Sequence, residues 1–211
     1  MHTKPEYLNW KMLSCTKISH GKWLLFLNAG DLFYNQQVLE KVASFDNDKY
    51  SALYGSTNLQ AYDLHRIVEP QDISNLTKHM IFCHQSVFIS REVMMEYNYN
   101  INYKFVADFD FFLRCYLAGE KYKELPIIIS TFRIGGASTS GNFEMFYEEL
   151  NVRKNNNVIS DQEYQEEFND LKKKEKVHNI FKAFKKRVPK LIVERIDKKR
   201  FSKDGYTSAE V

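Results

Sequence analysis

Two carboxylates and one imidazole stand out in this sequence because of the residues around them. Asp31 closes the segment LNAGD (27–31), in which an apolar run stops at a tight turn. Asp108 lies at the start of ADFDFFLR (107–114), and His84 lies within CHQSVFIS. A carboxylate can hold a hard divalent cation, or it can take a proton from a hydroxyl group that attacks a substrate. These residue types fit cation binding and acid–base chemistry, provided that the fold brings them together.

The element that must position Asp31 is the apolar run WLLFLN (23–28). Gly21 bounds it on one side and the turn on the other, as expected of a buried strand in an α/β sheet. Ligands of open α/β sheets bind at the carboxyl edge of the strands, where Asp31 falls. The plain alternative is an Asn-x-Gly-Asp turn whose residues serve only the turn itself.

The element that must position Asp108 is a helix predicted over 107–119. A carboxylate at its start suits the free N–H groups, and Gly119 suits its end. Asp110 and Arg114 are four residues apart and can pair on the helix surface. Asp108 could also serve only as a cap. The predicted apolar face, at helical spacing, consists of Phe109, Phe112, Leu113, Tyr116 and Leu117.

The rest of the chain alternates between helical and strand patterns, which predicts an α/β fold. Predicted helices cover 6–19, 38–45, 91–97 and 142–154, with a loop and short helix over 71–79. Predicted strands cover 51–56, 64–70 and 125–133, a loop leads into a strand over 83–90, and a flexible loop covers 135–142.

Composition and charge exclude several classes of protein. The 211 residues are 44% hydrophobic, and three cysteines are too few for a disulfide framework, so we expect reduced thiols in a cytoplasmic protein. No signal peptide or transmembrane run is visible.

Residues 172–200 hold 13 Lys and Arg against 3 Asp and Glu. Apolar residues at helical spacing across 177–196 predict that this basic tail contacts an anionic membrane surface. Packing on the body or simple solvation are the alternatives, and nucleic acid is not an expected partner.

The segment GKWLLFLNAGDLF (21–33) resembles the strand and DXD-type motif of family 2 glycosyltransferases with the GT-A fold. It is closest to the FLNxGD variants in enzymes that make bacterial surface polysaccharides. ADFDFFLR (107–114) resembles the family's ED-type segment, with Ala107 in place of the usual Glu. CHQSVFIS (83–90) resembles the loop and strand that line the family's acceptor pocket. FRIGGAS (132–138) resembles the strand and glycine loop that come after the catalytic segment in the sequence.

The resemblance implies a role for each matching residue. Asp31, helped by Asn28, would hold Mg²⁺ or Mn²⁺ on the donor diphosphate, and Asp108 would be the catalytic base. The residues implied in donor or acceptor binding are His84, Gln85, Asp110, Arg114, Gly135 and Gly136. A structural histidine and an ordinary glycine turn are the alternatives for the 83–90 and 132–138 segments.

The resemblance also implies an architecture and a function. We expect a partial GT-A domain over 1–155, with a mixed, mostly parallel sheet, and a basic helical extension over 156–211. The implied function is inverting transfer of a sugar from a UDP- or GDP-linked donor to a glycan or polyprenyl-linked acceptor in capsule, O-antigen or exopolysaccharide synthesis. We expect the protein at the inner face of the plasma membrane.

The family's nucleotide-binding segment normally precedes the 21–33 motif, and this sequence does not show it. We therefore expect a truncated chain: a gene fragment, which could be inactive, a mis-called start, or half of a split enzyme whose partner chain supplies the missing half. A membrane-binding module and a phosphodiesterase that uses Asp31 and Asp108 are further alternatives.

Overall fold

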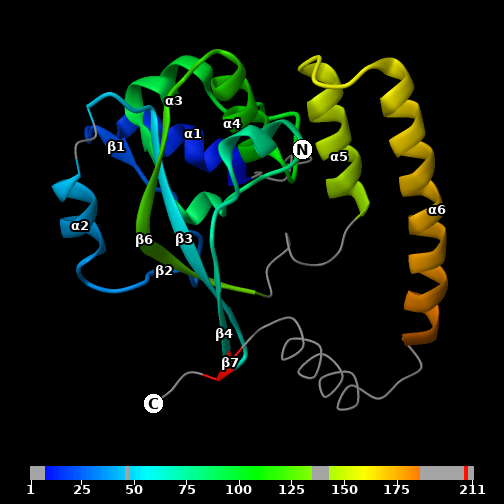
Figure 1. Ribbon diagram of the computed structural model, residues 1–211, viewed down its shortest axis with the longest axis horizontal. Helices are drawn as coiled ribbons and strands as arrows, with labels where there is room; N and C mark the ends of the chain where they lie inside the picture. The colour runs from blue at the N-terminus through cyan, green and yellow to red at the C-terminus, as the bar shows by residue number, and fades with distance from the viewer. Residues whose placement is uncertain (1–7, 46–47, 135–142, 186–206, 209–211) are drawn as a thin grey trace, which may run out of the picture.

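The computed structural model describes residues 8–45, 48–134, 143–185 and 207–208, and these residues form a mixed β-sheet with helices packed around it (Figure 1). The helices are α1 (Leu8–Ile18), α2 (Val38–Ser44), the 3₁₀ turns η1 (Ile73–Thr77) and η2 (His84–Ser86), α3 (Arg91–Tyr97), α4 (Ala107–Leu117), α5 (Phe143–Asn155) and α6 (Asp161–Lys185). The strands are β1 (Trp23–Leu24), β2 (Leu32–Phe33), β3 (Ala52–Ala61), β4 (Leu64–Val68), β5 (Val87–Ser90), β6 (Tyr122–Arg133) and β7 (Thr207–Ser208).

The α/β class and the mixed sheet agree with the sequence, but the expectation of mostly parallel strands is wrong. Five of the six pairings between described strands are antiparallel, and only β3 and β6 run parallel. For one of these pairs the reason is a short connection. Only two residues separate β3 from β4, and a connection that short can only reverse the chain. A parallel pair needs a crossover, which α3 and α4 provide between β5 and β6.

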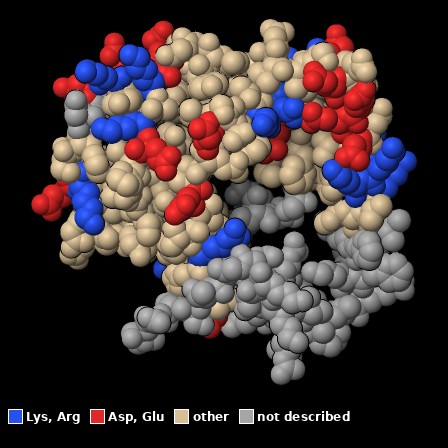
Figure 2. Space-filling view, in the orientation of Figure 1, with Lys and Arg blue, Asp and Glu red and all other residues tan. Residues whose placement is uncertain are grey.

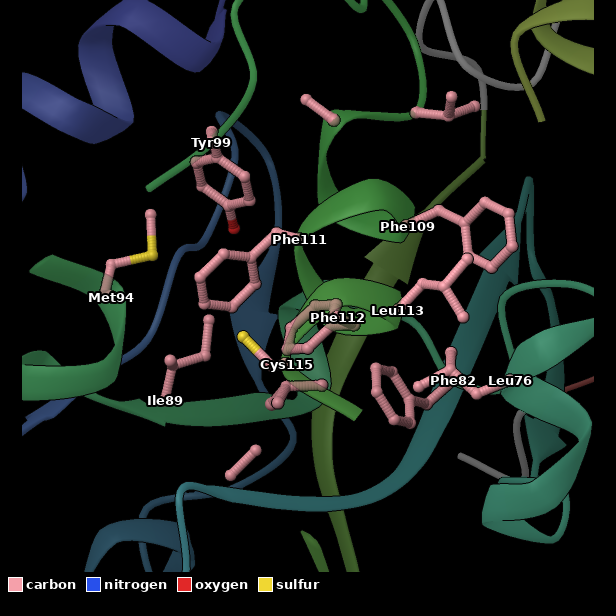
Figure 3. Packing of buried hydrophobic residues seen from close by; sticks show 14 of the residues in the cluster. Leu76, Phe82, Ile89, Met94, Tyr99, Phe109, Phe111, Phe112, Leu113 and Cys115 are labelled. Atoms are coloured by element: carbon pink, nitrogen blue, oxygen red, sulfur yellow. The ribbon is translucent and has the colours of Figure 1, made fainter. Parts of the chain in front are cut away.

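The main hydrophobic core lies between the sheet and helices α3 and α4 (Figure 3). Phe112, which is fully buried, meets Phe82 and Phe111 with ring centroids 5.0 Å and 5.2 Å apart. The helix buries more than one face, so Phe111 is 1% exposed although the pattern did not select it. The prediction that Leu117 joins the core is wrong, because its side chain is 49% exposed at the end of α4.

A second, smaller core lies on the other face of the sheet, under α2. The predicted strand 23–28 is regular only over Trp23–Leu24, and all six of its residues are half-buried rather than buried. Among the described strands, β1 pairs with β5 alone. An apolar groove of about 450 Å³ borders β1 and α2, lined mainly by Trp23, Leu39, Val42, Phe45 and Phe88.

Beyond α4 and β6, the helices α5 and α6 run side by side as a hairpin (Figure 1). Arg153 of α5 donates two hydrogen bonds to Glu167 of α6, at 2.7 Å and 2.9 Å. The predicted boundary after residue 155 falls in the turn between the two helices, and these contacts cross it. Carboxylates gather where α6 begins beside α5, and lysines follow further along (Figure 2), a distribution that suits the helix dipole.

The predicted basic tail begins within α6, and its residues 186–206 lie outside the described part of the chain. Val177, at its start, is 53% exposed. None of the described helices has the length and apolar character needed to cross a membrane.

Candidate functional site

The turn that carries Asp31 is closed by hydrogen bonds in both directions. The Asp31 N–H donates to the Asn28 carbonyl at 3.0 Å, and the Asn28 N–H donates to Asp31 Oδ2 at 3.3 Å. Gly30 has φ +98°, a conformation that a residue with a side chain rarely adopts in a turn. Arg133, at the end of β6, donates its N–H to Asp31 Oδ1 at 3.3 Å. The carboxylate, in a residue only 9% exposed, is therefore held at the edge of the sheet.

His84 joins this turn to the start of α4. Its Nδ1 lies 3.1 Å from Asp108 Oδ2, and its Nε2 lies 3.4 Å from the side-chain nitrogen of Asn28. The side chains of His84 and Asp108 are 17% and 27% exposed, so both are sheltered but reachable. Three residues that the sequence analysis singled out from three separate segments thus meet in one place.

The short helix η2 fixes His84 relative to the sheet. Ser86, which is fully buried, hydrogen bonds to Thr57 Oγ1 and Ser130 Oγ, each at 2.7 Å, and so connects η2 to β3 and β6. Burial raises the pKa of the neighbouring Cys83 thiol, a hydrogen bond with Thr57 lowers it, and the nearby charges of Asp108 and Asp31 raise it further. The two carboxylates therefore both lie near the segment that carries His84.

Helix α5 supplies two acidic residues that sequence reasoning missed. Glu148 accepts hydrogen bonds from the N–H groups of Lys104, Phe105 and Val106, at 3.0, 2.7 and 3.3 Å. Its carboxylate thereby fixes the chain just ahead of α4 and Asp108. The only signal in the sequence was a pair of adjacent acidic residues in the middle of a predicted helix.

Glu149, the second of these residues, lies close enough to Asp108 for the two charges to interact. Burial raises the pKa of Glu149 to about 7, the charge of Asp108 adds to the rise, and Arg153 opposes it. A second carboxyl group, protonated over part of the neutral range, therefore lies near the Asp108 carboxylate.

In the structure, Asp110 and Arg114 form the pair that their spacing of four residues predicted. Asp110, 3% exposed, accepts from Arg114 Nε at 2.8 Å and from the Asn156 side chain at 3.3 Å. Asp108 and Asp110 are two residues apart on a helix and so point to different sides. The Asp110–Arg114 pair therefore supports the fold, because its hydrogen-bonding groups are used within the protein.

Of the remaining predicted ligand residues, the structure describes only Gln85. Gln85 is buried, with 4% of its surface exposed, next to Ser86. Gly135 and Gly136 lie outside the described residues.

Chemically, His84 contacts a proton acceptor, Asp108, through one ring nitrogen and the turn that carries Asp31 through the other. Asp108 can take a proton from a hydroxyl group, and Asp31 with Asn28 can face a cation or a polar group. Within the described part of the chain, no group of three or more His, Cys, Asp or Glu residues is arranged to hold a metal ion by itself.

The chain is similar to known proteins at the level of the sequence and of the fold. No protein-family model matches the chain. Over 110 residues it is 34% identical to proteins named PGL/p-HBAD biosynthesis glycosyltransferase in Mycobacterium tuberculosis and in Mycobacterium bovis; the match covers 47% of this chain. The chain spans 40% of the length of these curated relatives. The matched relatives are thus named as glycosyltransferases, and the match covers part of each chain.

A solved structure resembles the fold of this chain. The chain is similar to S. aureus TarS 1–349, crystallised in complex with UDP, with a TM-score of 0.51 and 15% identity. The similarity covers 76% of this chain and 48% of that one. At this identity the likeness concerns the fold alone.

Proposed function

We propose that the chain is the catalytic-centre portion of a nucleotide-sugar glycosyltransferase. The observation that carries the proposal is the contact that joins the Asn28–Asp31 turn, His84 and Asp108 at one edge of the sheet. The glycosyltransferase relatives and the fold of a UDP-bound structure support it. The site thus combines a donor-side carboxylate and an acceptor-side base.

In the proposed reaction, an acceptor hydroxyl attacks the anomeric carbon of the donor sugar. The new carbon–oxygen bond forms as the bond to the diphosphate breaks, and the bonding electrons leave with the diphosphate. Asp108 Oδ2, sheltered beside His84, accepts the hydroxyl proton. Attack from the side opposite the diphosphate inverts the anomeric centre, in keeping with a single catalytic carboxylate.

Asp31 and Asn28 at the turn can supply part of a cation-binding site, and the phosphates of the donor would supply further ligands. Mg²⁺ typically binds one or two protein carboxylates, with substrate phosphates and water filling the remaining positions. Asp31 and the side-chain oxygen of Asn28 are such a partial set, and so we expect weak Mg²⁺ or Mn²⁺ binding without nucleotide. When bound, the cation would supply positive charge to stabilise the departing diphosphate.

The proposal extends to the donor, the acceptor, the setting and the family. The donor would be UDP-linked, by analogy with the UDP in the TarS complex, or GDP-linked. The acceptor would be a glycan or a lipid-linked glycan, since the relatives are named for PGL/p-HBAD biosynthesis and the residues from 177 to 200 are basic. We propose bacterial surface polysaccharide assembly at the inner membrane face as the setting, with a GT-A fold of family 2. Because β1 pairs on one edge only among the described strands, a further strand-bearing partner segment could complete the nucleotide site.

Calorimetric titration of the purified chain with UDP and GDP, with and without Mn²⁺, tests the proposal. We expect Mn²⁺-dependent binding that weakens about 10- to 100-fold in Asp31→Asn. Asp161→Asn is the matched control, because that carboxylate is 93% exposed at the start of α6. Binding that ignores Mn²⁺, or an Asp31→Asn variant that binds as well as the control, would contradict the proposed donor site.

A further inference from the structure

His84 contacts both the donor-side turn and Asp108, and its two ring nitrogens have different neighbours. Nδ1 faces a carboxylate oxygen of Asp108 at 3.1 Å, and Nε2 faces the amide nitrogen of Asn28 at 3.4 Å. The Asp108 carboxylate requires a hydrogen-bond donor on the imidazole, and the Asn28 nitrogen requires an acceptor.

A neutral imidazole satisfies both neighbours in one tautomer only. An ionised carboxylate accepts hydrogen bonds and donates none, so the proton belongs on Nδ1. Nε2 then carries a lone pair, which accepts from the Asn28 amide nitrogen. The opposite tautomer would set a lone pair against the Asp108 carboxylate and an N–H against the Asn28 N–H.

This tautomer also decides which way Asn28 faces. The orientation of an amide group follows from its hydrogen-bond partners. With its nitrogen held by His84, Asn28 turns its side-chain oxygen away from the ring. That oxygen is the atom that can approach a cation or a polar group of the donor.

The backbone of His84 is held firmly enough to impose these orientations. The two residues that follow it are buried, and Ser86 ties η2 to β3 through Thr57 and to β6 through Ser130. His84 therefore enters the site from the sheet, while its two partners come from a turn and from the first turn of a helix.

We propose that His84 is a positioning residue which, as the Nδ1–H tautomer, holds the Asp108 carboxylate and turns the Asn28 oxygen toward the donor side. The inference rests on the proposed function, since it assigns His84 a part in the same site. It makes the orientation of the donor-side amide depend on the acceptor-side carboxylate.

Two substitutions separate the two contacts. The side-chain nitrogen of Asn occupies nearly the position of Nδ1, so His84→Asn keeps a donor for Asp108 and loses the partner of Asn28. The amide of Gln reaches the position of Nε2, so His84→Gln keeps the contact with Asn28 and loses the one with Asp108. His79→Gln is the control, because His79 is bound to Gln71 at 3.0 Å outside the site.

We expect the two variants to fail in different steps. His84→Asn should weaken Mn²⁺-dependent nucleotide binding about 10-fold, the low end of the effect of losing a residue that orients a metal ligand. His84→Gln should bind nucleotide like the control and lose turnover instead. Equal effects of both variants on nucleotide affinity would overturn the inference.

A spectroscopic measurement distinguishes this inference from the proposed function. Long-range ¹H–¹⁵N correlation spectra of the ¹⁵N-labelled chain assign the proton to one ring nitrogen of each neutral histidine. We expect His84 to carry it on Nδ1, and to lose this preference in Asp108→Asn. An Nε2–H tautomer, or a mixture, in the unsubstituted chain overturns the inference even if nucleotides bind. An Nδ1–H tautomer without nucleotide binding would leave the positioning role standing and refute the proposed function.

Discussion

Arg114 on α4 hydrogen bonds to the buried carboxylate of Asp110 and at the same time to the end of α3. Its Nε donates to Asp110 at 2.8 Å, and its other two nitrogens donate to the carbonyls of Tyr97 and Asn98 at 2.9 Å and 2.7 Å. One guanidinium therefore joins the helix that carries Asp108 to the helix before it.

Arg114→Ala is expected to lower the free energy of unfolding by about 3–5 kcal/mol, because it leaves the Asp110 charge buried without its partner. The measurement is urea unfolding followed by circular dichroism. Lys174→Ala is the matched control, since Lys174 and Asp170 form an exposed pair with the same spacing. We expect it to cost about 0.5 kcal/mol or less. Similar costs for the two variants would show that the Asp110–Arg114 pair is not structural.

Glu148 offers a second test of what holds Asp108 in place. Glu148→Ala removes the acceptor of three backbone N–H groups ahead of α4 and should cost about 1–3 kcal/mol of stability. Glu144→Ala, on the same helix, removes only a carboxylate that is 68% exposed and lies 3.9 Å from Lys104. Thermal unfolding of both variants, at equal protein concentration, makes the comparison. A Glu148→Ala variant as stable as Glu144→Ala would mean that those N–H groups find other acceptors.

The raised pKa of Glu149 predicts a dependence of stability on pH. Its pKa in the folded protein is about 7, above the ordinary value of 4.5, so the folded state holds this proton more tightly than the unfolded state does. The resulting stability is fully present below about pH 4.5 and is lost as the pH rises through about 7. Glu149→Gln, which stays neutral, should therefore gain about 1–3 kcal/mol relative to the unsubstituted protein at pH 8, but little at pH 5.

Urea unfolding of both proteins at pH 5, 6.5 and 8 measures this difference. A stability difference that does not change with pH would show that Glu149 titrates normally. A larger difference at pH 5 than at pH 8 would reverse the sign and contradict the burial of this carboxyl group near Asp108.

The contrast between Phe112 and Leu117 shows what helical spacing can predict. The pattern predicted α4 within two residues and Phe112 in the core, since local propensity and the spacing of apolar residues act within the helix itself. It could not predict that Leu117 is 49% exposed, because that depends on where the sheet ends beneath the helix. For the same reason the spacing of Asp31, His84 and Asp108 suggested a site, but the contact of His84 with both sides depends on η2 packing against β3.

Those two residues also give a direct test of the core. Phe112→Ala should cost about 3–5 kcal/mol, because it removes a fully buried ring from contact with Phe82 and Phe111. Leu117→Ala, on the same helix, should cost well under half of that, since much of its side chain is already in water. Chemical unfolding of the two variants provides the measurement. Equal losses would place Leu117 in the core after all.

The two carboxylates of α4 should separate catalysis from stability. Asp108→Asn keeps the size of the side chain but removes the proton acceptor, so we expect the rate of sugar transfer to fall by about 10²- to 10⁴-fold with little change in stability. Asp110→Asn weakens the buried pair with Arg114, so we expect lower stability and a rate close to that of the unsubstituted protein at a temperature where both are folded. Release of nucleoside diphosphate from a nucleotide sugar, with acceptor present, measures the rate, and circular dichroism measures the folded fraction. If Asp110→Asn slowed transfer as much as Asp108→Asn in fully folded protein, the base could not be assigned to Asp108, because the two side chains leave the helix in different directions.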